Sequence, residues 1–210
     1  MRLLTFILFA SIIFIACKSK DKAMEAKPVE PIAKDSLLVT DSSWGVVTKD
    51  LSFTDLVGLF GKEQLKDERI CGPECADSID VTYIFPDTDK EITVYWKTGA
   101  WHKNIAFLET YKEKSPYYTS DSLKIGSTLD QLLNKNGQKI SFSGFGWDYG
   151  GYIQSYNGGT LDSSQINYRL DINDEGTALL GDSNFDTDMP AAKKALTKIK
   201  VWQLQLSFDK

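Results

Sequence analysis

The chain has 210 residues, of which 24 are lysine or arginine and 29 are aspartate or glutamate, giving a formal net charge of −5 at pH 7. An acidic chain without a basic patch is not expected to bind nucleic acid, nor to attach to lipid headgroups by charge alone. Hydrophobic residues make up 42% of the sequence and include five tryptophans, which is enough for a packed core in one domain or two small ones.

The amino terminus has the pattern of a secretory signal. Arg2 is followed by an apolar run from Leu3 to Ala16, which is shorter than the roughly 20 apolar residues that a membrane-spanning helix needs. The run ends at Phe14-Ile15-Ala16-Cys17, where a small residue precedes a cysteine, as in bacterial lipoprotein signals. We therefore predict a signal peptide over residues 1–16 and lipid attachment at Cys17. An ordinary signal peptide that ends near Ala16 is the alternative.

A lipid on Cys17 would make a bacterial membrane the first partner of the protein. Lys18 and Ser19 follow the cysteine, and neither is the aspartate often linked to retention at the inner membrane of enteric bacteria. Anchoring at the outer membrane is therefore predicted, with the protein facing the periplasm or the exterior. Residues 17–42 are rich in lysine, glutamate, proline and alanine, and we interpret them as a tether to the folded part.

Residues 43–120 are predicted to form a first module of one helix and an antiparallel sheet. Ser52, with Asp55 three residues later, is a capping signal for a helix that ends at Gly61. Period-two alternation of apolar residues then predicts strands near 81–85, 92–96 and 102–108.

Residues 121–210 are predicted to form a second module of the same kind. Ser127 and Asp130 repeat the capping spacing before a helix that ends at Gly137. Strands are expected at 139–145, 151–156 and 165–172. Coincidence is the alternative to a true repeat, because capping signals are common.

The chain is predicted to close with a helix and then a strand. Thr187 or Asp188 is the expected cap of a helix that has Pro190 in its first turn. In the last strand, alternation places four apolar residues on one face: Trp202, Leu204, Leu206 and Phe208. The predicted fold class is therefore α+β, with two helix-plus-antiparallel-sheet modules.

Cys71 and Cys75 are predicted to form a short disulfide, because the cell envelope is an oxidising compartment. The run Cys71-Gly72-Pro73-Glu74-Cys75 differs from the thioredoxin motif, which has two residues between its cysteines and an apolar strand before them. Redox chemistry is therefore not predicted.

The segment from Phe142 to Gly159 interleaves aromatic residues with glycines. Aromatic faces beside a glycine-rich backbone could stack on a sugar ring, and the candidate ligand-binding residues are Trp147, Asp148, Tyr149 and Tyr152. The pattern is also typical of core residues in a twisted sheet with bulges, and this structural interpretation is favoured.

Two acidic segments resemble parts of calcium loops. Asp171 to Gly176 has oxygen ligands at alternate places, but its twelfth residue is Asp182 where a bidentate glutamate is needed, so a hairpin turn over Asn173–Gly176 is the better interpretation. The alternating acidic and amide residues from Asp182 to Asp188 could bind Ca²⁺ in a loop. Helix caps and solvated turn residues explain the same pattern equally well. No metal site and no cofactor is predicted.

The sequence offers little for catalysis. His102 is the only histidine, no Gly-x-Ser-x-Gly motif is present, and one histidine with two paired cysteines leaves too few ligands for zinc. A carboxylate pair for glycoside cleavage is left open by the 29 acidic residues. The protein is predicted not to be an enzyme.

Two further segments carry a resemblance to known proteins. Phe145-Gly146-Trp147-Asp148-Tyr149-Gly150-Gly151 and the run Gly181 to Asp188 look like segments of a group of uncharacterised lipoproteins from Bacteroidetes-type bacteria. The helix-plus-meander modules are similar in architecture to outer-membrane assembly lipoproteins of the SmpA/OmlA type and to β-lactamase-inhibitor proteins. These resemblances imply a binding protein. The expected function is thus protein interaction or scaffolding in the envelope, and the alternative is glycan binding, so the expected partner is an envelope protein or a glycan.

Overall fold

The computed structural model describes residues 35–72, 78–173 and 178–208. Cys17 and Cys75 lie outside these ranges, as do the signal segment and residues 174–176 of the expected hairpin turn, so those predictions stay untested. In the described part of the chain the elements are, in order, β1 (Leu38–Thr40), β2 (Ser43–Trp44), α1 (Phe53–Phe60), a 3₁₀ turn η1 (Lys62–Gln64), β3 (Leu65–Cys71), β4 (Ser78–Ile84), β5 (Ile92–Trp96), β6 (Ile105–Thr110), β7 (Tyr118–Thr119), α2 (Leu129–Asn136), β8 (Ser141–Ser143), β9 (Ile153–Ser155), β10 (Ile166–Asp171), β11 (Asn184–Asp186), α3 (Pro190–Ala195) and β12 (Lys200–Ser207). None of these helices is long and apolar enough to span a membrane.

The predicted α+β class is confirmed, with α3 followed by β12 at the carboxyl end. The main sheet has the strand order β10-β12-β6-β5-β4-β3, and all its neighbouring strands are antiparallel. Two three-stranded sheets accompany it, in the orders β2-β1-β7 and β11-β8-β9. Of the pairs in these smaller sheets, β1 and β7 are parallel.

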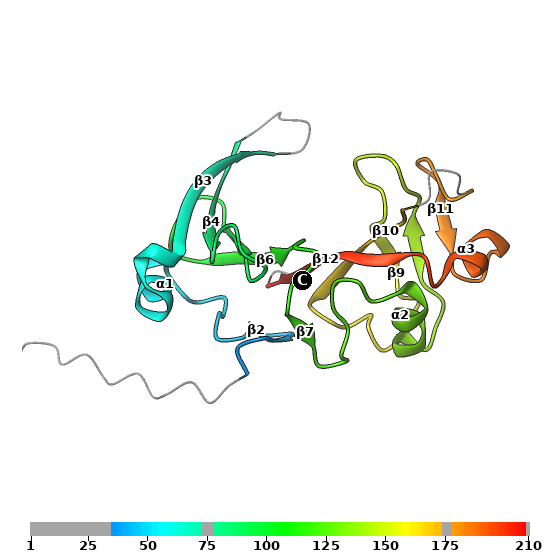
Figure 1. The fold of residues 1–210 in the computed structure, drawn as a ribbon, viewed down its shortest axis with the longest axis horizontal. Coiled ribbons are helices and arrows are strands. Elements are labelled where there is room, and N and C mark those ends of the chain that lie inside the picture. Colours follow the sequence, from blue (N-terminus) through cyan, green and yellow to red (C-terminus); the bar gives the residue numbers. More distant parts are fainter. Residues whose placement is uncertain (1–34, 73–77, 174–177, 209–210) are drawn as a thin grey trace, which may run out of the picture. The chain divides into compact units, whose positions relative to one another are not determined.

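The last strand joins the two halves of the sequence. β12 lies between β10 and β6, so strands from before and after residue 120 share the main sheet (Figure 1). One face of this sheet packs into a core that includes Leu56 of α1, Leu108 of β6, Leu132 of α2 and Leu204 of β12, which are all fully buried. The opposite face is the one that positions the candidate site.

The helix caps agree with the predictions in one helix and differ in two. Ser52 and Asp55 form the expected capping box of α1, and Gly61 and Gly137 follow the last residues of α1 and α2. The cap of α2 is Thr128 with Gln131, one residue later than predicted, because the Thr128 hydroxyl is the one that accepts from the Gln131 amide.

The cap of α3 was also predicted incorrectly. Met189 occupies the cap position, and it has no side-chain oxygen with which to accept a hydrogen bond. Thr187 is buried instead, and its hydroxyl accepts from the Ile140 amide, so it anchors the strands rather than the helix. Pro190 in the first turn is confirmed.

Two strand features could not be predicted from alternation. β3 was missed because its middle residues are charged, and this composition is typical of an edge strand that avoids pairing with other chains. Trp202 was expected on the same face as Leu204, but the register shifts between Arg169 and Leu170 on the neighbouring strand. The irregularity leaves the Trp202 side chain exposed while Leu204 is buried.

Asn136 fastens the end of α2 to a loop of the second half. Its buried side-chain amide donates to the Gln138 and Tyr156 carbonyls at 2.8 Å each, and its Oδ1 accepts from the Leu161 amide at 3.2 Å. Replacing Asn136 with alanine is expected to cost about 2–4 kcal/mol of unfolding free energy, because the backbone groups it satisfies would stay buried without it. Urea unfolding of Asn136→Ala measures this.

The exposed Asn134, two residues earlier on the same helix, provides the control. Asn134→Ala is expected to change the unfolding free energy by less than about 0.5 kcal/mol. Equal losses in the two variants would contradict the role assigned to Asn136.

Candidate ligand-binding groove

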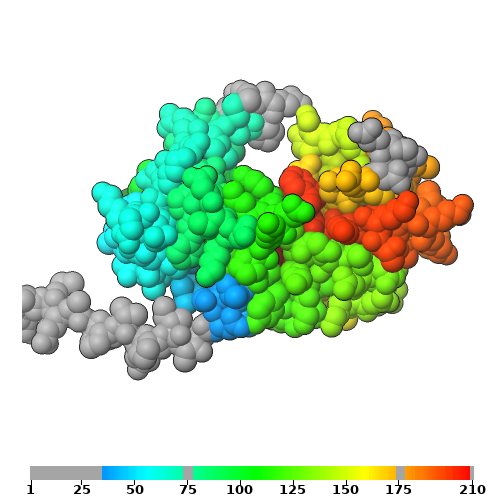
Figure 2. Space-filling model, viewed as in Figure 1, coloured from blue at the N-terminus to red at the C-terminus, as the bar shows by residue number. Residues whose placement is uncertain are grey.

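The face of the main sheet opposite the core carries a groove with a volume of about 470 Å³. The groove is lined from both edges of the sheet, by Ile70 of β3 on one side and by Arg169 of β10 on the other, so the sheet must curve around it. Figure 2 shows the hollow between the blue-green surface of β3 and β4 and the yellow-to-red surface that includes β12. Its lining residues are Ile70, Cys71, Gly72, Ile79, Tyr95, Phe107, Glu109, Tyr111, Tyr152, Arg169, Trp202, Gln203 and Gln205.

A carboxylate lies on the floor of the groove. Glu109 of β6 is only 7% exposed, although carboxylates are rarely buried without partners. Its Oε1 accepts a hydrogen bond from the Tyr95 hydroxyl at 2.7 Å, and its Oε2 accepts one from Gln203 Nε2 at 2.6 Å. Gln205 Nε2 lies 3.5 Å from the same Oε2. Strand pairing produces this arrangement, because Gln205 is directly opposite Glu109 across β12 and β6.

Burial dominates the electrostatics of the floor. Loss of solvent raises the pKa of Glu109 above its ordinary value, although the hydrogen bonds from Tyr95 and Gln203 act in the opposite direction. Burial, and then the nearby charge of Glu109, also raises the pKa of the Tyr95 hydroxyl, so this group stays a hydrogen-bond donor at neutral pH. Stacking on Phe107, with ring centroids 4.1 Å apart, fixes the Tyr95 ring.

The raised pKa of Glu109 predicts a pH-dependent stability. The folded chain binds the Glu109 proton more tightly than the unfolded chain, so folding stability should fall as the pH rises from the unfolded pKa, about 4.3, through the raised folded pKa. The loss is about 1.4 kcal/mol for each unit by which the pKa is raised. Urea unfolding of wild type and Glu109→Gln between pH 4 and 8 isolates this group. If wild type instead gained stability over the variant as the pH rose, the hydrogen bonds would outweigh burial.

Exposed aromatic rings form a continuous row beside the floor. The centroids of Trp147 and Tyr149 are 5.4 Å apart, and those of Tyr149 and Tyr152 are 6.5 Å apart. At the other end, Trp202 and Tyr111 are 6.4 Å apart. We call these five residues the aromatic row. Each is more than a third exposed, so the row is not part of the core.

Arg169 joins the two ends of the aromatic row. Its guanidinium carbon lies 4.2 Å from the centroid of the Tyr152 ring and 5.0 Å from that of Trp202, which are cation–π distances. A bridge pairing of Tyr152 with Arg169 places the first ring, and the exposed position of Trp202 on β12 provides the second. Without this cation, two separate aromatic groups would remain.

Arg169 also holds the loop that carries the first three aromatic residues. Its Nε donates to the Gly150 carbonyl at 2.8 Å, and its Nη2 donates to the Asp148 carbonyl at 2.5 Å. Trp147 Nε1 donates to the Gly144 carbonyl at 2.9 Å, which fixes the indole on the same loop. The row is therefore built before any ligand binds.

The structure brings three of the four predicted ligand-binding residues into the aromatic row. Trp147, Tyr149 and Tyr152 are exposed beside one another, so the favoured structural interpretation of these three as core residues is wrong. Tyr152 lines the groove itself. Asp148 contributes its backbone carbonyl to Arg169, rather than an observed side-chain contact.

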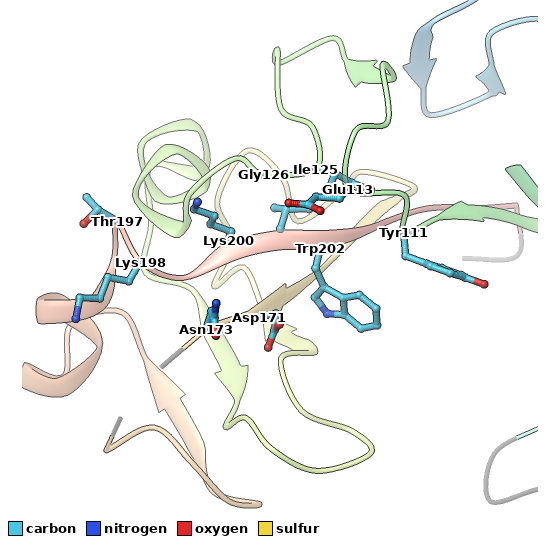
Figure 3. A pocket seen from close by; sticks show the side chains of 11 residues that line it. Tyr111, Glu113, Ile125, Gly126, Asp171, Asn173, Thr197, Lys198, Lys200 and Trp202 are labelled. Carbon is cyan, nitrogen blue, oxygen red and sulfur yellow. The ribbon is translucent and has the colours of Figure 1, made fainter. Parts of the chain in front are cut away.

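A second hollow of about 680 Å³ adjoins the groove at Trp202 and Tyr111, which line both. Figure 3 shows these two rings at one end of the hollow, with Thr197 and Lys198 at the other and Lys200 between them. Its carboxylates are Glu113 and Asp171, and the latter is opposite Lys200 across β10 and β12. An elongated ligand in the groove could thus continue past Trp202.

Other sequence candidates lie elsewhere. The His102 ring stacks between Phe53 and Trp101, at centroid distances of 4.2 and 4.1 Å, and its Nε2 is 3.1 Å from Asp67 Oδ1. It is in a turn rather than at the predicted strand start, because its φ of +63° interrupts extended backbone. Of the acidic segment, Asp186 is in β11 and accepts from Lys139 Nζ at 2.8 Å. No group of three or more potential metal ligands occurs among the described residues.

Comparison with known proteins gives a fold but no function. No protein-family model matches the chain, and no curated protein matches it. The fold is similar to the crystal structure of the uncharacterized protein yfeY from Escherichia coli, with a TM-score of 0.50 and 13% sequence identity. The match covers 80% of this chain and 98% of that one.

Proposed function

We propose that this protein is a glycan-binding protein of the bacterial envelope, with the groove and the aromatic row as its binding site. The observation that carries the proposal is the continuity of the row. Five exposed rings and one guanidinium follow one another beside a floor of carboxylate and amide groups. Contiguous exposed apolar patches of this kind mark binding surfaces, whereas single exposed rings are normal on a protein surface.

A glycan matches both parts of this surface. The C–H faces of a pyranose can stack on rings such as Trp202 and Tyr152, while its hydroxyls can hydrogen-bond to polar groups such as Glu109 and Gln205. A purely apolar ligand would displace water from the remaining lone pairs and N–H groups of this floor without replacing its hydrogen bonds, at a cost of about 1–3 kcal/mol for each group left unpaired. The adjoining hollow favours an oligosaccharide over a single sugar.

The proposal includes the location predicted from the sequence. Lipid on Cys17 would hold the protein at a membrane, with outer-membrane anchoring favoured. Residues 17–42 would act as a tether that lets the groove contact envelope glycans at a distance from the membrane. Binding rather than catalysis is proposed, because the His102 ring packs between Phe53 and Trp101 and does not line the groove.

We also propose that the chain belongs with the uncharacterised Bacteroidetes-type lipoproteins, with only a distant fold likeness to SmpA/OmlA-type and β-lactamase-inhibitor proteins. The two segments that carry the first resemblance lie together in the fold. The Phe145 amide donates to the Leu179 carbonyl at 2.8 Å, and the Gly181 amide donates to the Phe145 carbonyl at 2.9 Å. A conserved pair of such segments would preserve the loop of the aromatic row.

The test is a glycan array probed with the full-length protein and with Trp202→Ala. Wild type is expected to bind a defined set of glycans, and the variant to bind them about 10- to 100-fold more weakly. Burying a large apolar side chain contributes about 1.5–3 kcal/mol, and 1.4 kcal/mol corresponds to a tenfold change in affinity.

Trp101→Ala is the matched control, because Trp101 is also exposed but does not line the groove. Its affinity for the same glycans is expected to equal that of wild type. Failure of wild type to bind any glycan, or equal losses in both variants, would contradict the proposed site.

Protein interaction or scaffolding is the second candidate function, and the composition of the aromatic row favours it. Tyrosine, tryptophan and arginine are enriched where protein interfaces are strongest. Crosslinking in intact envelopes, followed by affinity capture from wild-type and Trp202→Ala cells, separates the two candidates. A single protein captured by wild type and lost in the variant, with no glycan binding on the array, would favour the interaction role.

A further inference from the structure

Resting on the proposed function, we infer that the groove selects glycans without acidic groups, such as neutral or N-acetylated sugars, and rejects those that carry carboxylates. Several hydrogen-bond donors of the groove already have partners within the protein. The proposed selectivity concerns the chemical class of the ligand and would fail separately from glycan binding itself.

The floor of the groove is rich in acceptors. Gln203 and Gln205 both direct an Nε2 donor toward Glu109 Oε2, so one N–H of each amide is already used. The Gln203 residue is only 9% exposed, and its Oε1 has no hydrogen-bond partner in the described part of the chain. A buried acceptor without a donor is uncommon and costly, and here it lies beside the groove that Gln203 lines.

The charged donor of the groove is committed to the protein. Arg169 uses Nε and Nη2 on the Gly150 and Asp148 carbonyls, its Nη1 lies 3.5 Å from the Tyr152 hydroxyl oxygen, and the Tyr152 and Trp202 rings lie against the guanidinium. The Tyr95 hydroxyl donates to Glu109. The remaining donors at the groove include tyrosine hydroxyls, which can bond a sugar hydroxyl or an acetamido carbonyl but carry no charge to neutralise that of a carboxylate.

Charge strengthens this preference. At a pH where Glu109 is ionised, a sugar carboxylate near the floor would face its charge in a site of reduced dielectric, where like charges repel more strongly than in water. Hydroxyl and amide N–H groups would instead donate to the acceptors that the floor presents. Selectivity therefore follows from the placement of one carboxylate on a floor whose donors are partly used by the protein.

The test compares neutral, N-acetylated and uronate-containing glycans of matched linkage on the array and then by calorimetry with the full-length protein. Neutral or N-acetylated glycans are expected to bind at least about tenfold more tightly than their uronate counterparts, which is about 1.4 kcal/mol. Tighter binding of uronates would overturn the inference while leaving the proposed function intact. Absence of binding to every glycan would overturn the proposed function itself.

Glu109→Gln tests the residue behind the selectivity. The variant is expected to narrow the difference between neutral and uronate glycans, and its folding is checked by circular dichroism. Glu63→Gln is the control, because Glu63 is an exposed carboxylate that lines neither the groove nor the adjoining hollow. If a folded Glu109→Gln variant kept the wild-type affinity difference between neutral and uronate glycans, or if both variants narrowed that difference equally, Glu109 would not be the residue behind the selectivity. The ranking of glycans by the wild-type protein tests the inference without either variant.

Discussion

Replacing Gly151 with alanine is expected to destabilise the fold by more than about 3 kcal/mol, or to prevent folding. A Cβ at this position would lie 1.8 Å from the Leu170 carbonyl oxygen, and the Gly151 φ of +74° is unfavourable for any residue with a side chain. The backbone segments at Gly151 and Leu170 cannot easily move apart, because the Leu170 amide donates to the Gly151 carbonyl at 2.8 Å. Urea unfolding of the purified variant measures the loss.

Gly158 separates the two causes of this effect. Its φ of +73° is nearly the same, but an added Cβ there meets nothing within 4 Å. Gly158→Ala is expected to lower the unfolding free energy by only about 1–2 kcal/mol, which is the effect of the positive φ alone. If the two variants lost the same stability, the close approach of the Gly151 loop to β10 would be contradicted.

Arg169→Ala is expected to weaken glycan binding by about 100-fold or more, which exceeds the effect of removing any single ring. The substitution removes two cation–π contacts and both hydrogen bonds that hold the loop of Trp147 and Tyr149. Stability should also fall, by about 1–3 kcal/mol, because hydrogen bonds to a charged group contribute about 1.5–3 kcal/mol. Calorimetric titration with an array-selected glycan, and unfolding in urea, measure the two effects.

Two further variants show whether the guanidinium itself is required. Arg169→Lys keeps the charge but cannot donate to two carbonyls while stacking between two rings, so most of the affinity loss should remain. Arg69→Ala removes an exposed arginine whose contact is an ion pair with Asp80 on β4, at 2.7 Å from Nε to Oδ1. Arg69→Ala is expected to leave both binding and stability nearly unchanged, because exposed ion pairs contribute little. Full affinity in Arg169→Lys would show that charge alone suffices.

Local patterns in the sequence predicted much of the fold. Alternation located β4, β5 and β10 within a few residues, and the capping signal at Ser52 located the start of α1. Pairing over long distances could not be predicted in this way. The insertion of β12 between β10 and β6 depends on contacts between residues almost 100 positions apart, such as Gln203 and Glu109.

The candidate site was predicted only in part, for the same reason. The aromatic and glycine pattern identified Trp147, Tyr149 and Tyr152, although their exposure was not predicted, because strand alternation does not show which face is covered. Glu109 has no local signal, since its burial arises from glutamines on another strand. Trp202 was expected on the same face as Leu204, because alternation does not reveal the shift in register where β12 meets its neighbour.

The most direct test of the central claim follows the five tryptophan indole N–H signals in a ¹⁵N–¹H spectrum while the tightest neutral glycan from the array is added. If the groove and the aromatic row bind the glycan, the signals of Trp147 and Trp202 should move together with one dissociation constant. The signals of the buried Trp44 and Trp96, and of Trp101 outside the groove, should stay in place. Movement of the Trp101 signal without that of Trp202 would place the glycan elsewhere and contradict the account.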